Sequence, residues 1–348
     1  MKILYGVVGE GMGHATRSHC IIDHLIKNHE LKVVASARAY NYLKRFYSDI
    51  LEIQGFELKF ENNMLDRKSS IAHMAKYLPK KSAKNFLEFT KTSMEFSPDV
   101  ALSDFDSFAY WYGKFHDIPI ISIDNMQIIN RCNIELPAKL LKDFLLAKAV
   151  VMGKLPGCYH YLITSFFFPE ILKENTSLFP PILREEILDA TAPQKNHILV
   201  YQSSTSNENL LKILKGIDAQ FIVYGYNQNK QVGNIVLKKY SENGFIKDLA
   251  SARGVIANSG FSLIGEALYL KKPYFAIPLQ GQFEQTMNGI YLERLGYGEY
   301  HMELSSKKIN KFIKNIDTYR ENLQNFKHDR NKKIYRKLDS LFVEISKK

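Results

Sequence analysis

The sequence has few cysteines and no long uncharged apolar run. Its three cysteines, Cys20, Cys132 and Cys158, share no metal-ligand spacing and are odd in number, so a reduced cytoplasmic setting fits best. No stretch approaches the roughly 18 apolar residues that a membrane-spanning helix needs. The opening residues MKILYGVVG have the pattern of a first strand and make a poor signal peptide. We therefore expect a cytoplasmic protein that is soluble or peripheral to a membrane.

Positive charge, in contrast, is abundant and uneven. The 348 residues have a formal net charge of +11. Residues 307–348 carry 13 Lys and Arg against 5 Asp and Glu, and residues 62–91 carry 7 against 2. Two such patches suggest contact with anionic lipid, nucleic acid or phosphorylated substrates. A solvated helix face and a frayed tail would explain the same charge without any partner.

Apolar β-branched runs alternate with helical patterns in both halves of the chain. Strands are predicted by the runs at 2–8, 31–36, 97–105, 118–124, 196–204, 219–226, 254–260 and 272–280. Short apolar strands that alternate with helices indicate parallel sheets covered by helices on both faces. The series is interrupted near Pro180 and Pro181, where we place a domain boundary.

The predicted fold class is therefore α/β, with two Rossmann-like doubly wound domains over residues 1–180 and 181–348. A chain of 348 residues agrees with two domains. Residues 62–91 have the pattern of a helical insertion, and from Ser305 the chain has the pattern of a basic helical tail.

A glycine-rich loop, GVVGEGMGHATRS, follows the first predicted strand and opens a helix. A dinucleotide fingerprint would need a third glycine where His14 stands and an acidic residue at the end of the second strand, which reads VVASAR. A P-loop would need Lys-Ser/Thr to follow, and none does. A nicotinamide cofactor is therefore disfavoured. Glycines allow the backbone to approach a ligand closely, and free N–H groups at a helix start favour an anionic or polar ligand.

His14 is the candidate general base of this loop. Doubly wound folds bind ligands at the carboxyl ends of their strands, where His14 is predicted to lie. Imidazole titrates near neutrality, and a helix N-terminus favours its neutral form, so the ring can accept a proton from a hydroxyl. Arg17 lies three residues on, close to the same helix face, and could meet an acidic group. A histidine that only caps the helix is the alternative.

The second half contains a comparable strand end at Asn258-Ser259-Gly260, and a helix is predicted to begin at Phe261. The N-terminal amides of this helix, with Ser259 and Ser262, can cradle a diphosphate. Glu266 lies in its second turn, on the side that faces the loop, where a carboxylate can accept both hydroxyls of a ribose. The polar loop 280–285 follows the next strand and suits the hydroxyl groups of a sugar.

These motifs resemble the nucleotide-sugar donor site of GT-B fold glycosyltransferases. The nearest groups are the UDP-glycosyltransferases and the enzyme that adds N-acetylglucosamine to the lipid-linked peptidoglycan precursor. Their pattern is a small-residue turn, S-x-x-E-A, a Pro-containing strand, a D/E-Q pair and an asparagine. It is matched here by Ser262, Glu266, Ala267, Pro273, Pro278, Glu284, Gln285 and Asn288. The stretch GEGMGHATR resembles the same families' glycine loop, and LFPPILREEI resembles their interdomain segment.

The resemblance implies a role for each matching residue. It implies two domains facing a central cleft, with His14 as the base. The implied acceptor-binding residues are Gly11, Met12, Gly13, Arg17 and Asp124. The implied donor-binding residues are Ser203, Ser204, Phe245, Ile246, Asn258, Ser259, Gly260, Phe261, Ser262, Glu266, Gln280, Glu284 and Gln285. In the related enzymes the positions of Phe245 and Ile246 hold the base through backbone groups, and Ser203 and Ser204 stand where many relatives have glycine.

The stretch SDFDS places Asp104 and Asp106 at the end of a predicted strand. A D-x-D pair holds a divalent metal in a different class of glycosyltransferase, but the strand-to-helix position here disfavours that use. We predict that Asp104 orients His14 as a second catalytic residue and that Asp106 caps the following helix. Purely local roles for both carboxylates are the alternative.

The resemblance implies a metal-independent, inverting glycosyltransferase that needs no cofactor beyond its co-substrate, a nucleoside-diphosphate sugar, with UDP preferred. The acceptor would be a hydroxyl, with a lipid-linked or cell-envelope glycan as one class, reached at the inner membrane face through the basic patches. A UDP-sugar hydrolase on the same scaffold is the first alternative, because the hydrolase of pseudaminic acid synthesis has a similar G-x-G-H-x-x-R loop. A basic nucleic-acid-binding protein is the second, disfavoured because no RNA or DNA motif is present.

Overall fold

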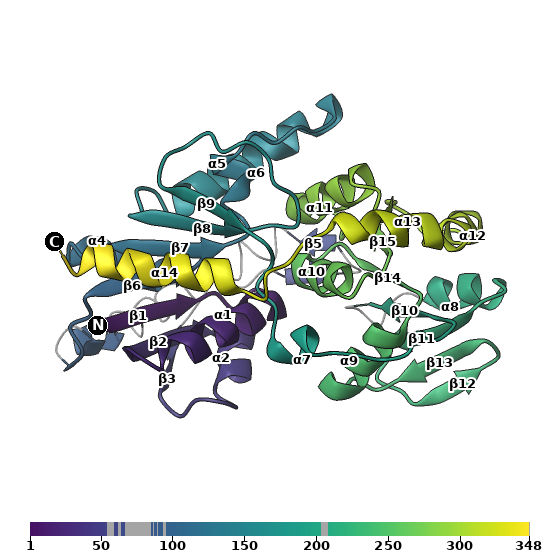
Figure 1. Cartoon of the computed structure of the whole chain (residues 1–348), viewed down its shortest axis with the longest axis horizontal. Coiled ribbons are helices and arrows are strands. Elements are labelled where there is room, and N and C mark those ends of the chain that lie inside the picture. The colour runs from purple at the N-terminus through teal and green to yellow at the C-terminus, as the bar shows by residue number, and fades with distance from the viewer. Residues whose placement is uncertain are drawn as a thin grey trace. The chain divides into compact units, whose positions relative to one another are not determined.

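A computed structural model describes residues 1–53, 59–61, 64–66, 85, 87–88, 90–92, 95–202 and 208–347. The chain forms two compact units, each with its own sheet (Figure 1). Unit 1 comprises Met1–Lys59, Asp66–Arg184 and Asp329–Lys348, and unit 2 comprises Phe60–Leu65 and Glu185–His328. Ser203, Ser204 and most of the basic segment 62–91 lie outside the described residues.

The sheet of unit 1 has seven strands in the order β3-β2-β1-β6-β7-β8-β9. All of its strand pairs are parallel, as the apolar runs predict. Its strands are β1 (Lys2–Val7), β2 (Glu30–Ser36), β3 (Ile50–Ile53), β6 (Val100–Asp104), β7 (Ile120–Asp124), β8 (His160–Thr164) and β9 (Thr176–Phe179). Strands β3, β8 and β9 were not among the predicted ones.

Helices cover both faces of this sheet because successive side chains of β1 point in opposite directions. Ile3 and Tyr5 pack in the larger core cluster of the unit, and Leu4 packs with Phe108 on the other face. The helices of the unit are α1 (Met12–Leu25), α2 (Ala37–Leu43), α4 (Ser107–Phe115), α5 (Ile128–Arg131), α6 (Leu141–Lys154) and α14 (Lys332–Ile345), with a 3₁₀ turn at Ala138–Leu140.

The C-terminal segment departs from the predicted domain assignment. Residues Asp329–Lys348 belong to unit 1 and not to the second domain, and the other boundary falls after Arg184 instead of Pro180. The apolar side of α14 packs in the same core cluster as β1, through Ile334, Leu338, Leu341, Phe342 and Ile345. Where the chain enters α14, Asn331 Nδ2 donates to Leu183 O at 2.7 Å and Asn331 Oδ1 accepts from Leu183 N at 3.0 Å. The segment is helical, but it is a core element and no free tail.

Unit 2 repeats the design with the strand order β12-β13-β11-β10-β14-β15-β16. Its strands are β10 (His197–Tyr201), β11 (Gln220–Tyr224), β12 (Lys230–Val232), β13 (Ile235–Lys238), β14 (Gly254–Asn258), β15 (Tyr274–Ile277) and β16 (Gly298–Tyr300). The pairs are parallel except for β12 with β13 at one edge. Its helices are α7 (Glu185–Leu188), α8 (Glu208–Lys215), α9 (Glu242–Ser251), α10 (Phe261–Tyr269), α11 (Phe283–Arg294), α12 (Ser306–Lys314) and α13 (Ile316–Asn322), with a 3₁₀ turn at Leu323–Asn325.

The predicted helical insertion holds a strand in its first residues. Strands β4 (Lys59–Glu61) and β5 (Met64–Asp66) form a two-stranded sheet. In the part of the chain that the structure describes, no helix is both long enough and apolar enough to cross a membrane.

Replacing Leu338 by alanine is expected to destabilise unit 1, because the side chain is fully buried between α14 and the sheet. The cavity should lower the free energy of unfolding by about 2–5 kcal/mol. Val343 lies on the same helix with 53% of its surface exposed, so Val343→Ala is the matched control and should change stability by less than about 0.5 kcal/mol. Urea unfolding followed by circular dichroism measures both. If Leu338→Ala lowered the free energy of unfolding as little as the control does, the result would contradict the packing of α14 in the core.

Candidate active site

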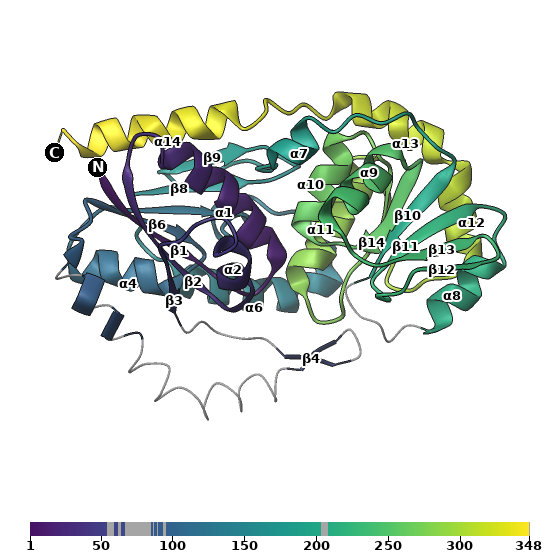
Figure 2. The same cartoon turned by 90° about the horizontal axis from the view of Figure 1, so that it is seen from below.

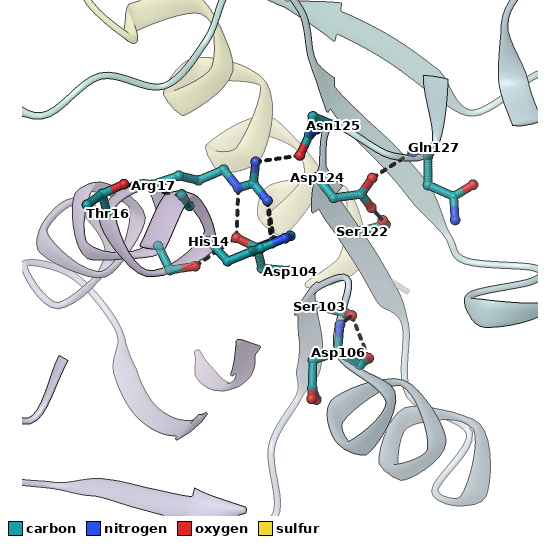
Figure 3. Close-up of polar contacts among 12 residues, drawn as sticks. His14, Thr16, Arg17, Ser103, Asp104, Asp106, Ser122, Asp124, Asn125 and Gln127 are labelled. Carbon is teal, nitrogen blue, oxygen red and sulfur yellow. Dashed lines mark hydrogen bonds and ion pairs between the residues drawn. The ribbon is translucent and has the colours of Figure 1, made fainter. Parts of the chain in front are cut away.

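At the carboxyl edge of the unit 1 sheet, side chains of the first helix contact a carboxylate at the end of a neighbouring strand. Strand β6 ends at Asp104, next to Val7 at the end of β1, and α1 begins directly after the β1 loop. Figure 3 shows His14 and Arg17 of α1 pointing toward Asp104, with Asn125 beyond the end of β7. The predicted catalytic pair, His14 and Asp104, is therefore brought together.

Asp104 is fully buried and receives hydrogen bonds from three side chains of α1. His14 Nδ1 lies 2.7 Å from Asp104 Oδ1. Arg17 donates through Nε to Oδ2 at 2.7 Å and through Nη2 to Oδ1 at 2.6 Å. Ser18 Oγ donates to Oδ2 at 2.9 Å. A bidentate guanidinium is among the strongest partners that a buried carboxylate can have.

The charges around Asp104 decide its protonation state. Burial alone would raise its pKa, but the charges and hydrogen bonds of Arg17 and His14 outweigh this and lower the pKa to about 2. Burial likewise opposes the charge of Arg17, but the Asp104 carboxylate raises the pKa of Arg17 overall. At neutral pH the site therefore holds a buried ion pair.

An ionised Asp104 determines the tautomer of His14. A carboxylate without a proton can make a 2.7 Å contact with Nδ1 only if Nδ1 carries the hydrogen. The lone pair is then on Nε2. Arg17 Nη2 also lies 2.7 Å from Nδ1 and donates to Asp104 Oδ1, so this carboxylate oxygen accepts from both groups when Nδ1 is protonated. The His14 side chain is 16% exposed, which leaves the ring accessible to a substrate.

The glycines of the loop allow close packing against β2 and leave the start of α1 without a capping side chain. A Cβ at Gly9 would lie 2.2 Å from Ser36 O, so the loop can approach β2 only without a side chain there. Gly9 and Gly11 do not adopt the left-handed backbone conformation that would favour glycine for a turn. Gly11 is the N-cap of α1 and offers no side-chain hydrogen bond, and a Cβ there would meet nothing within 4 Å. The first N–H groups of α1, at Met12 and Gly13, are thus not covered by a capping side chain.

Two residues predicted to contact the acceptor are enclosed instead. The three nitrogens of the Arg17 guanidinium group are engaged, since Nη1 also donates to Asn125 Oδ1 at 2.9 Å. Asp124 is fully buried, where Oδ2 accepts from Ser122 Oγ at 2.6 Å and Oδ1 from Gln127 N at 2.7 Å. Burial raises the pKa of Asp124. Both side chains are buried and brace the site.

The two carboxylates of the D-x-D motif point to different places. Asp106 Oδ1 accepts from Ala109 N at 2.9 Å and caps α4, as predicted. Burial raises the pKa of Asp106 to about 6. Since Asp104 is held by α1 and Asp106 by α4, the pair is not arranged as a shared metal ligand set (Figure 3).

The sequence did not predict the supporting contacts that three residues make. Ser18 donates to Asp104, Tyr5 donates through its hydroxyl to Ser18 Oγ at 2.9 Å, and Asn125 accepts from Arg17. Ser18 lies four residues after His14, and this spacing on a helix was the available signal. Nothing in the sequence pattern pairs Tyr5 with Ser18.

The candidate donor residues from Asn258 to Ser262 lie where β14 ends and α10 begins. Gly260 is the N-cap of α10 and supplies no side-chain hydrogen bond to the first turn of the helix. Asn258 Nδ2 donates to Ile277 O at 3.1 Å, and Asn288 Nδ2 donates to Ser259 O at 3.1 Å. Both bonds hold the loop that presents this helix start.

Two buried polar atoms at this sheet edge have no hydrogen-bond partner. They are Ser259 Oγ, after β14, and Gln202 Oε1, after β10. Strands β10 and β14 pair in parallel, so both atoms lie at the same carboxyl edge. Among the described side chains of unit 2, no other buried polar atom lacks a partner. Natural proteins satisfy most buried polar groups, so an exception calls for a specific explanation.

The remaining donor candidates divide into buried and accessible side chains. Glu266 is buried in the second turn of α10. Gln285 is also buried, accepts from Leu279 N at 2.9 Å and donates to Gln282, so it braces the 280–285 loop. Glu284, partly exposed, accepts from Asn288, and Gln280 is exposed.

Phe245 and Ile246, which the resemblance implies hold a base through backbone groups, lie inside α9. Phe245 N donates to Ser241 O at 2.8 Å in the first turn, so this amide is already used. Its buried ring packs against Tyr201 and Tyr224, with ring centroids 5.5 and 5.2 Å apart. Ser241 caps α9, and the helix therefore starts before Phe245.

The chain is similar in sequence or in fold to several glycosyltransferases. An uncharacterized glycosyltransferase of Methanosarcina acetivorans is 24% identical over 86% of this chain and 85% of its own length. The UDP-N-acetylglucosamine–N-acetylmuramyl-(pentapeptide) pyrophosphoryl-undecaprenol N-acetylglucosamine transferase 3 of Bacillus cereus is 29% identical over 38% of each chain.

A solved structure shows the fold. The structure of a UDP-glucosyltransferase from Polygonum tinctorium matches with a TM-score of 0.71 and 14% identity over 100% of this chain and 98% of that one. The model of glycosyl transferase family 1 matches residues 1–317. These matches support the predicted glycosyltransferase and not the alternative of a nucleic-acid-binding protein. The chain belongs to glycosyl transferase family 1, and it is a glycosyltransferase with the two-domain GT-B fold.

Proposed function

We propose that the protein transfers a sugar from a UDP-sugar to an acceptor hydroxyl with inversion at the anomeric carbon, and that His14 is the general base. The observation that carries this proposal is the contact of His14 Nδ1 with the buried, ionised Asp104. It leaves Nε2 as the ring nitrogen that can accept a proton. A His–Asp pair that orients the imidazole and stabilises its protonated form is a common device of acid–base catalysis.

The proposed step balances without any redox or metal partner. The acceptor oxygen forms a bond to the anomeric carbon, while the bond from that carbon to the diphosphate oxygen breaks and its electron pair leaves with UDP. The acceptor proton moves to His14 Nε2. Asp104 and the new imidazolium then form an ion pair, and Arg17 holds Asp104 in place during the change.

The donor assignment rests on the carboxyl edge of the unit 2 sheet. The uncapped start of α10 would stabilise the charge of the diphosphate as it leaves. A bound donor would supply the partners that Ser259 Oγ and Gln202 Oε1 lack. Glu266 is proposed to hold the ribose hydroxyls. The preference for UDP is supported by the names of the B. cereus and P. tinctorium enzymes, both of which include UDP.

The acceptor is proposed to be a hydroxyl of a lipid-linked or cell-envelope glycan on the cytoplasmic side of a membrane. The name of the B. cereus enzyme, which includes an undecaprenol-linked acceptor, supports this class. Metal independence is proposed because Asp104 accepts from Arg17 of α1 while Asp106 caps α4, so the two carboxylates do not form one ligand set.

His14→Gln should lower kcat by about 100- to 10,000-fold, because glutamine cannot accept the acceptor proton. Binding of UDP should be unchanged. Transfer is measured with a panel of UDP-sugars and of lipid-linked and soluble glycan acceptors, and UDP binding by calorimetry. His24→Gln, a substitution on the same helix away from Asp104, is the control. Rapid transfer by the His14 variant would falsify the role of this residue.

The same assay separates transfer from hydrolysis. A transferase should release UDP much faster when its acceptor is present. Release at an equal rate with and without every acceptor would favour the UDP-sugar hydrolase alternative.

Glu266→Ala should weaken UDP binding by about 10- to 100-fold, since charge-assisted hydrogen bonds to the ribose would be lost. Glu303 is exposed in the same unit, so Glu303→Ala is the matched control and should bind UDP normally. Calorimetric titration with UDP, GDP and dTDP measures the affinity and the preference for the base. No binding of any of the three nucleotides, or an equal effect of both substitutions, would contradict the donor assignment.

The ion pair at Asp104 predicts a loss of stability in acid. The pKa of about 2 lies below the ordinary 3.8, so this carboxylate stabilises the fold above about pH 4, and the contribution is lost as the pH falls toward 2. The difference corresponds to about 2 kcal/mol. The difference in the free energy of unfolding between the wild type and Asp104→Asn should therefore decrease by this amount as the pH falls from about 4 toward 2.

Asp106→Asn provides the matched control for that measurement. The pKa of Asp106 is about 6, above the ordinary 3.8, so its contribution is present in acid and is lost as the pH rises through 6. The two variants should thus differ from the wild type with opposite pH dependence. The same pH dependence for both would contradict the ion pair.

A further inference from the structure

Helix α6 presents an apolar surface to solvent. Val151 is the buried residue of this helix, which the structure describes throughout. Five large apolar side chains are each 50–60% exposed: Leu141, Leu145, Leu146, Val150 and Met152. With about 100° between successive residues, all five fall on one half of the helix, opposite Val151. A contiguous apolar patch on a soluble domain marks an interaction surface.

Helix α4 extends this patch with two aromatic rings. Trp111 and Phe115, four residues apart, are 61% and 78% exposed. The end of α4 is held against the chain that follows α6, because Tyr110 Oη donates to Pro156 O at 2.9 Å and Lys114 Nζ donates to Gly157 O at 2.8 Å. Figure 2 shows both helices on the side of the unit 1 sheet opposite α14. We call the seven apolar residues of the two helices the α4–α6 face.

The charge of these helices is positive. Together they carry Lys114, Lys142, Lys148 and Lys154 against a single carboxylate, Asp143. Lys142 is exposed and lies among the leucines on the outer half of α6. A lysine in this position can keep its stem on an apolar surface and its ammonium group at an anionic boundary.

We propose that the α4–α6 face docks on the surface of a membrane that contains anionic lipid. Helices with leucine and aromatic residues on one face and lysines around it lie in the lipid interface, where tryptophan is enriched. Each lysine adds attraction to anionic headgroups. A second copy of this chain is the less suitable partner, because it would bring the same excess of lysines against this face. The proposal does not depend on the transfer chemistry, and it differs from the expected docking through segments 62–91 and 307–348.

Trp111 reports on the proposal directly, because it is the single tryptophan of the chain. Vesicles of phosphatidylcholine with about one-third phosphatidylglycerol should shift its emission to shorter wavelength and should quench it when they carry brominated acyl chains. Vesicles of phosphatidylcholine alone should have a much smaller effect. Binding of the anionic vesicles without any change in Trp111 emission would overturn the proposal, as would no binding at low salt.

Leu145→Ser combined with Val150→Ser should weaken vesicle binding in flotation by about tenfold or more, because two apolar anchors are lost. Both side chains are exposed, so the fold should be retained. Val343→Ser is the matched control, since Val343 is 53% exposed on α14. Equal binding by the double variant and the wild type would contradict the assigned face.

Charge variants distinguish this face from the C-terminal basic segment. Lys142→Glu should weaken binding to the anionic vesicles by about tenfold, and Lys333→Glu on the exposed side of α14 should have little effect. The reverse result would assign docking to the C-terminal segment. Sedimentation of the wild type and the double serine variant tests self-association. A dimer that the serine variant dissociates, without vesicle binding, would show that the face pairs with a second copy.

Discussion

The site of unit 1 depends on one buried ion pair, that of Asp104 with Arg17. A carboxylate removed from water keeps its charge only if other groups replace the water, and here Arg17, His14 and Ser18 do so. These three residues stand at positions i, i+3 and i+4 of the same helix. One carboxylate at the end of β6 therefore sets the rotation of α1 and the tautomer of His14 together.

The polar groups around Asp104 and those beside α10 differ in how they are satisfied, although Ser36 Oγ and Thr164 Oγ1 at the ends of β2 and β8 in unit 1 also lack partners. Around Asp104 the polar atoms have partners, and Tyr5 and Asn125 extend the network one step further. At the edge of unit 2, Ser259 Oγ and Gln202 Oε1 lack partners. A preorganised network suits a group that must hold one orientation while a proton moves. Unsatisfied groups at a helix start suit a ligand that arrives and leaves.

The sequence predicts much of this fold, because the central parallel strands are short and mostly apolar. It also predicts that His14 and Asp104 meet, since both follow strands of one sheet. It does not predict that Arg17 is enclosed, because helical spacing indicates a shared face and not what covers it. Likewise, the sequence pattern of the C-terminal segment predicts a basic helix without indicating that α14 is buried or which core it joins. That choice depends on contacts such as Asn331 with Leu183, which are distant in sequence.

The protonation of His14 in the resting protein is the most direct test of this account. Long-range nitrogen–proton NMR of the protein with labelled histidine distinguishes the two ring nitrogens, and a variant that lacks His14 identifies its signals. The account predicts that the neutral ring carries its proton on Nδ1 and its lone pair on Nε2. A ring with its proton on Nε2 would contradict it, because Asp104 would then not orient His14 and the ring could not accept the acceptor proton.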